Sequence, residues 1–187
     1  MKKYVALLIV LTCALSVLAK NDVTVEEGTL SELANKNARL FVTWDYTNST
    51  IEGKNVKAFL KEKGEDWFNN YPGELKTAEE RFFSRYNKKT KGTKAVLNKS
   101  EAQYKVVIKV RNFDYGHMSS DVASGIGAGD ARLFATMEVY KVGSKEPAAI
   151  IDVDGVSGDG TGHVYRRVET YRELAEQFAK LIRKAAK

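Results

Sequence analysis

The chain has 187 residues, with 30 lysines and arginines against 24 acidic residues, so its formal net charge is +6. Apolar residues make up 43% and charged residues 29%, a globular composition that excludes an intrinsically disordered chain. A single cysteine excludes a disulfide framework, a cysteine zinc site and an iron–sulfur cluster, and two histidines leave little for a histidine-based metal centre.

The N-terminus has the three parts of a secretory signal peptide. Residues 1–3 include two lysines, and residues 4–17 are almost wholly apolar. Side chains of small or moderate size precede a cleavage point between Ala19 and Lys20. The apolar run is shorter than the roughly 18–20 residues that span a bilayer, so we favour cleavage over a membrane anchor. Cys13 follows a threonine, which does not fit a lipoprotein signal.

Removal of residues 1–19 changes the composition of the working protein. Residues 20–187 contain no cysteine and two lysines fewer, so their net charge is +4. We expect one domain over residues 20–187, exported to the periplasm or to the outer surface, with no transmembrane span after cleavage.

The first half of this domain reads as strands followed by helices. A short strand begins near Val23, and residues 39–47 alternate between apolar and polar side chains. Asn55 is a helix cap before residues 56–60, which have helical apolar spacing. A turn is predicted at residues 71–73, which read Tyr-Pro-Gly, and a second helix at residues 75–86.

The second half reads as three alternating strands and one helix. Residues 103–113, 132–142 and 148–156 each have one apolar face and one polar face, as an antiparallel sheet with one covered side requires. Residues 165–186 form a long amphipathic helix. We therefore predict an α+β fold: a mixed, largely antiparallel sheet with helices packed on one face and a long C-terminal helix.

A glycine-rich segment at residues 125–130 is the nearest approach to a nucleotide-binding motif. It reads Gly-Ile-Gly-Ala-Gly-Asp, whereas the dinucleotide fingerprint needs its third glycine one place later and a P-loop needs a lysine. A connection between two strands is favoured, and no cofactor is expected.

A second glycine-rich segment, residues 152–162, holds Asp152, Asp154 and Asp159, whose carboxylates suit a hard cation. The calcium-loop spacing requires a glycine at the sixth place and a glutamate at the twelfth, but Ser157 and His163 stand there. A strand end running into a loop is favoured, and a metal-assisted enzyme at this loop is kept as an alternative.

Other catalytic arrangements lack their defining motifs. No GxSxG elbow presents a nucleophilic serine, and His117 and His163 meet only if their loops converge. We therefore expect no enzyme activity, no catalytic residue and no metal site.

Charged and aromatic side chains suggest binding instead. Lys105, Lys109 and Arg111 alternate along the polar face of one strand and are our candidates for contact with a partner. Trp67 and Tyr71, near the predicted turn, are candidates for a glycan-binding platform if both rings are exposed. A basic stretch over residues 81–99 suits an anionic glycan, while export removes most of the case for nucleic acid.

The order of the segments also resembles a group of bacterial exported proteins. The strand at residues 102–110, the glycines at 125–129, the strands at 131–140 and 149–153, a glycine break and a C-terminal helix form a similar pattern. The group comprises the curli-secretion assembly lipoprotein, the penicillin-binding-protein activator lipoprotein and the N-terminal domain of the Tol translocation protein. This resemblance implies a compact domain that docks on other envelope proteins without catalytic residues. It supplies no functional residue that can be carried over.

The sequence thus predicts an exported, non-enzymatic domain that binds or scaffolds a protein partner in the bacterial cell envelope, through a sheet edge or the polar sheet face. A glycan-binding module and the metal-assisted enzyme remain the alternatives.

Overall fold

The computed structural model describes residues 22–116 and 130–187. The predicted signal peptide with Ala19 and Lys20, the glycine-rich segment at 125–129 and His117 lie outside the described residues.

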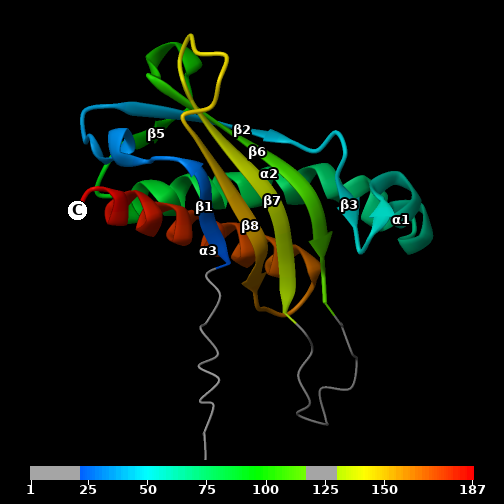
Figure 1. The fold of residues 1–187 in the computed structure, drawn as a ribbon. Helices are drawn as coiled ribbons and strands as arrows, with labels where there is room; N and C mark the ends of the chain where they lie inside the picture. Colours follow the sequence, from blue (N-terminus) through cyan, green and yellow to red (C-terminus); the bar gives the residue numbers. More distant parts are fainter. Residues whose placement is uncertain (1–21, 117–129) are drawn as a thin grey trace, which may run out of the picture.

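The centre of the fold is an eight-stranded sheet in which six strands follow the order β1-β8-β7-β6-β2-β5 (Figure 1). Adjacent strands from β1 to β6 pair antiparallel, whereas β2 pairs parallel with both β6 and β5. A small hairpin, β3 with β4, joins the end of β6. The strands are β1 (Val23–Gly28), β2 (Arg39–Asp45), β3 (Thr50–Ile51), β4 (Lys54–Asn55), β5 (Lys94–Val96), β6 (Tyr104–Asp114), β7 (Ala131–Lys141) and β8 (Ala149–Gly158).

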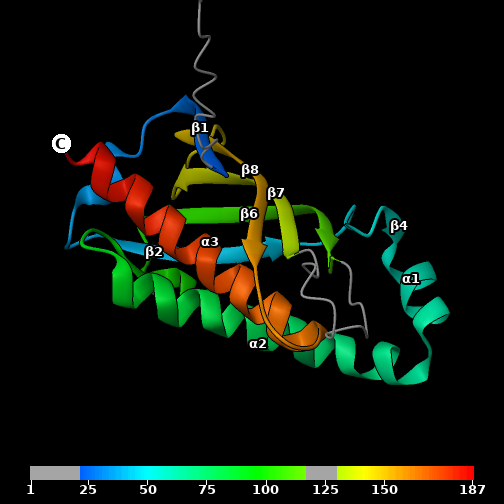
Figure 2. The ribbon, with the colours of Figure 1, turned by 90° about the horizontal axis from the view of Figure 1, so that it is seen from below.

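Two long helices, α2 (Glu65–Lys89) and α3 (His163–Ala185), lie side by side against one face of this sheet (Figure 2). The helix-facing side chains are apolar at every second position. On β6 they are Tyr104, Val106, Ile108 and Val110, all buried. This arrangement confirms the predicted α+β class, the mixed and largely antiparallel sheet, the helices on one face and the long C-terminal helix.

The smaller elements follow local sequence signals. Helix α1 (Val56–Lys63) begins after Asn55, whose side chain accepts a hydrogen bond from the Lys57 backbone N–H, as the cap predicts. It ends at Gly64, where φ is 103°, a value that favours glycine. Two short 3₁₀ helices, η1 (Ser31–Ala34) and η2 (Lys99–Glu101), precede β2 and β6.

The turn predicted at residues 71–73 is wrong, because α2 runs without interruption through Pro72. Trp67, Tyr71, Glu74 and Ala78 follow one another at helical spacing along the buried side of α2, while Pro72 lies on its exposed side. Packing of this stripe therefore outweighs the cost of a proline inside the helix, about 3 kcal/mol for the lost backbone hydrogen bond and the ring clash together. The hydroxyl of Thr77 donates to the Gly73 carbonyl at 2.8 Å inside the helix.

A charged network lies in the core where α2, α3 and β6 meet. The carboxylate of Glu74 accepts from Arg167 and, at 2.6 Å, from the Tyr115 hydroxyl, while Arg167 also donates to the Tyr115 oxygen at 2.6 Å. The exposed fractions are 4% for Glu74, 1% for Arg167 and 0% for Tyr115. Burial of the hydroxyl raises the pKa of Tyr115. The network joins both helices to the end of the central strand.

We predict that Glu74→Leu lowers the free energy of unfolding by about 3–5 kcal/mol, because it leaves the Arg167 guanidinium buried without its counter-charge. Urea unfolding followed by circular dichroism measures the change. The double variant Glu74→Leu/Arg167→Met should recover most of the loss, and Glu80→Leu on the exposed side of α2 should have little effect. An unchanged midpoint for Glu74→Leu would contradict the proposed role of this network.

Candidate functional site

The sheet face opposite the helices is uncovered within residues 22–116 and 130–187, and Figure 1 views the molecule from this side. Lys105 and Lys109 on β6 alternate with the buried core residues and therefore project from this uncovered face. Arg111 is the extra residue of a β-bulge, since the register passes from Val110 directly to Asn112 opposite β7. The structure thus brings the three predicted partner-facing residues to one face of one strand.

Two of these three cations are already paired across the strands. Lys109 Nζ lies 2.6 Å from Glu138 Oε1 on β7, and Arg111 Nη2 lies 2.7 Å from Asp152 Oδ1 on β8. Arg111 also donates to the Val153 carbonyl at 2.9 Å. The first pair joins the adjacent strands β6 and β7, and the second joins β6 to β8 across the intervening β7. Both pairs reduce the charge available to a partner.

The Glu138 carboxylate accepts hydrogen bonds from two side chains, Lys109 and Tyr140. Burial alone would raise the pKa of Glu138, but hydrogen bonds from Lys109 and from the Tyr140 hydroxyl, the latter at 2.6 Å, hold it below its ordinary value. The same bond to Glu138, together with burial, raises the pKa of Tyr140 to about 12.

Lys105 differs from its two neighbours, because no carboxylate in the described part of the chain pairs with it. It lies in a hollow of about 400 Å³ at the end of the uncovered face where β6 begins and β7 ends. We call this the lysine hollow. Its lining includes Phe41, Lys99, Lys105, Val107, Tyr140, Lys141 and Val142, with the Lys109–Glu138 pair at its side.

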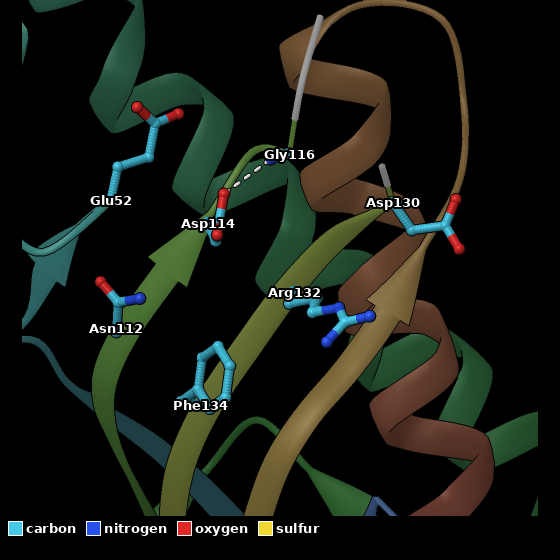
Figure 3. A pocket seen from close by; sticks show the side chains of 7 residues that line it. All are labelled: Glu52, Asn112, Asp114, Gly116, Asp130, Arg132 and Phe134. Atoms are coloured by element: carbon cyan, nitrogen blue, oxygen red, sulfur yellow. Dashed lines mark hydrogen bonds between the residues drawn. The ribbon is translucent and has the colours of Figure 1, made fainter. Parts of the chain in front are cut away.

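A second hollow of about 530 Å³ lies at the other end of the same face (Figure 3). Its lining is acidic, with Glu52, Asp114 and Asp130 against Arg132, and the Asp114 carboxylate accepts from the Gly116 backbone N–H at 2.7 Å. Within the described ranges, no group of three or more His, Cys, Asp or Glu side chains is placed to hold a metal ion. This hollow therefore offers negative charge but no ligand set for a metal.

The acids expected around the second glycine-rich segment do not form a loop cluster. Asp152 and Asp154 lie within β8, and Asp159 follows the end of that strand. Asp152 is bound by Arg111, as described above. The expectation of a strand end therefore holds for this segment, although the strand extends further, to Gly158.

The two candidate glycan-binding rings are not an exposed platform. Trp67 is half-buried and stacks on His163, with ring centroids 3.9 Å apart, and it makes a T-shaped contact with Tyr115, with ring centroids 5.3 Å apart. Tyr71 is also half-buried, and its ring faces the Arg167 guanidinium at 5.1 Å. The condition for a glycan-binding platform, that both rings are exposed, is not met, because the unbroken helix α2 packs both rings against the core.

One sheet edge is also incompletely paired. Strand β5 pairs with β2 only over Arg39–Phe41, so residues 42–45 have no strand partner on that side in the described chain. An apolar groove of about 500 Å³ lies beside them, lined by Val42, Trp44, Phe83 and the 81%-exposed Leu97 among others. Sequence reasoning missed this edge because it did not predict β5.

None of the helices in the described ranges is long and apolar enough to cross a membrane.

We predict that Glu138→Gln lowers the free energy of unfolding by about 1 kcal/mol at pH 7, because Lys109 and Tyr140 lose a charged acceptor. The folded-state pKa of Glu138 is lowered, so its contribution is present above the ordinary pKa of a glutamate and lost as the pH falls through the lowered value. Urea unfolding at pH 7 and in strong acid, with Glu101→Gln as an exposed control, measures this. An equal destabilisation at both pH values would contradict it.

No protein-family model matches the chain, and no curated protein matches it. Among solved structures, a chain of the PelC dodecamer from Paraburkholderia phytofirmans is 12% identical, with a TM-score of 0.44, over 82% of this chain and 96% of that chain. A chain of a single-substitution variant of that dodecamer, in another space group, is 11% identical with a TM-score of 0.42, over 83% and 95%. Likeness of this degree assigns neither a family nor a function to this chain.

Proposed function

We propose that this chain is an exported, non-enzymatic domain that docks on a protein partner in the bacterial cell envelope through the uncovered face of its sheet. The observation that carries the proposal is the presence of Lys105, Lys109 and Arg111 together on a broad sheet face that no described element covers. Exported domains without enzymatic chemistry act by contact, and a wide, flat face suits contact with another protein.

The state of the charged side chains supports binding rather than catalysis. Asp152, Glu138 and Glu74 each face a cation at ion-pair distance, so these carboxylates are held by structural partners. Acid–base catalysis needs a group free to exchange a proton with a substrate. The resemblance of the segment order to exported envelope domains favours the same function.

A docking mode through the sheet edge is the second candidate, and the groove beside residues 42–45 is the observation in its favour. Unpaired backbone groups at a sheet edge accept an extended segment of another chain, and neighbouring pockets take its alternate side chains. Leu97 and Phe83 offer apolar surface in this groove. The two modes predict contact at different residues, so one experiment separates them.

We predict that a photo-crosslinking residue, p-benzoylphenylalanine, at position 105 captures a discrete envelope protein in the producing cells. The same residue at position 97 reports the edge groove, and position 61 on the exposed side of α1 is the matched control. Mass spectrometry identifies the adducts. Adducts at 105 but not at 61 support the proposal, whereas adducts at 97 alone would favour docking through the edge. Absence of adducts at 97, at 105 and at position 134, which lies at the acidic end of the same face, would overturn both modes.

Charge reversal gives an independent test with purified protein and the captured partner. Lys105→Glu, Lys109→Glu and Arg111→Glu together should abolish co-purification, because they reverse the charge of the face. The triple variant Lys36→Glu, Lys57→Glu and Lys61→Glu changes the net charge equally at exposed positions elsewhere and should retain the partner. Circular dichroism establishes that both triple variants are folded. Unchanged co-purification by the first would contradict the proposal.

A further inference from the structure

The lysine hollow differs from the rest of the uncovered face in its unbalanced charge. Four lysines and one glutamate line it, and that glutamate, Glu138, is already bound by Lys109. Lys99, Lys105 and Lys141 have no carboxylate partner within the described residues. Glu146 lies on the neighbouring turn, close enough to raise the pKa of Tyr140 slightly, but does not line the hollow. Three lysines without a carboxylate partner therefore line one hollow.

The floor between these lysines is apolar. The rings of Phe41 and Tyr140 and the side chains of Val107 and Val142 line it, and Val142 is 52% exposed, which is high for a valine. The strand register explains why these side chains lie together, since Phe41 on β2 and Tyr140 on β7 both stand opposite Lys105 on β6. The hollow thus combines positively charged lysines with exposed apolar surface.

The position of the hollow leaves it open to another molecule. It lies between η2, which precedes β6, and the turn that joins β7 to β8, both at the upper end of the sheet in Figure 1. Its volume of about 400 Å³ lies in the range of pockets that accept small ligands or anchoring side chains.

We infer that the lysine hollow binds an acidic peptide segment of the envelope partner, with aspartates or glutamates on Lys99, Lys105 and Lys141 and an apolar side chain on the floor. This inference rests on the proposed function and adds the chemistry of the partner. Charge complementarity selects an acidic ligand. The apolar floor favours a peptide over a polyanionic glycan, because a glycan of that kind carries no side chain to cover Val107 and Val142.

The test is a binding titration of the purified protein with a fluorescein-labelled ten-residue peptide of aspartates and glutamates around one central leucine. Fluorescence anisotropy measures the dissociation constant. We expect Lys105→Glu to weaken binding at least tenfold, because it replaces an attraction by a repulsion. Lys57→Glu, which makes the same charge change on α1, should leave the affinity unchanged.

Two further measurements in the same titration test the apolar floor of the hollow and the chemical class of its ligand. Replacement of the central leucine by serine should weaken binding severalfold, and Val142→Asp should do the same. Equal affinities for the leucine and serine peptides, with displacement of both by heparin, would overturn the inference in favour of a polyanionic glycan. Equal affinities for the natural sequence and Lys105→Glu would overturn the site itself.

The outcomes also separate this inference from the proposed function. A crosslinking residue at position 134, at the acidic end of the uncovered face, reports contact away from the lysine hollow. Capture of an envelope protein there, without peptide binding at the hollow, would leave the docking face standing and contradict the peptide site. Capture at neither position 105 nor position 134, without peptide binding, would contradict both.

Discussion

Burial of one sheet face against α2 and α3 determines how the other elements of the fold are placed. Residues such as Val106, Ile108 and Met137 are fully buried on that side, and the alternation of strand side chains then sends every intervening residue to the opposite face. The helices are in turn joined to β6 by the Glu74–Arg167–Tyr115 network. The candidate binding surface is therefore a direct consequence of how the core is built.

Ion pairs neutralise the charged side chains in the middle of the uncovered face, whereas the two ends of the face carry unbalanced charge. The Lys109–Glu138 pair bridges the adjacent strands β6 and β7, and the Arg111–Asp152 pair joins β6 to β8 across β7. Partly exposed pairs of this kind contribute about 1 kcal/mol or less to stability but fix side-chain positions. The lysine hollow lies at one end and the acid-lined hollow at the other. A partner approaching this face meets opposite charges at its two ends, which would favour one orientation of docking.

Periodicity in the sequence was enough to predict the strands β6, β7 and β8, the helix α3 and the cover on one face. Helical periodicity also runs through α2, since Trp67, Tyr71, Glu74 and Ala78 keep the helical spacing past Pro72. In this helix the packing of the apolar stripe prevails over the local turn signal of residues 71–73. Glu74 and Arg167 also lie on the buried stripes of their helices, four residues before Ala78 and Tyr171. Charged residues at such positions indicate a buried pair.

Other features depend on contacts between distant segments and leave no local pattern. The parallel pairing of β2 with both β5 and β6 brings residues 39–45, 94–96 and 104–109 together. The lysine hollow likewise combines Phe41, Lys105 and Tyr140 from three strands. The sequence pointed to Lys105, Lys109 and Arg111 as one set, whereas only the structure separates the paired cations from Lys105.

Lysine footprinting shows whether a partner occupies the uncovered sheet face in the cell. Intact producing cells and purified protein are treated with the same amine-reactive reagent, and mass spectrometry measures the modification of each lysine. We expect Lys105 and Lys141 to be protected in cells and reactive in the purified protein, while Lys57 and Lys61 react equally in both. Equal reactivity of Lys105 in cells and in the purified protein would contradict it.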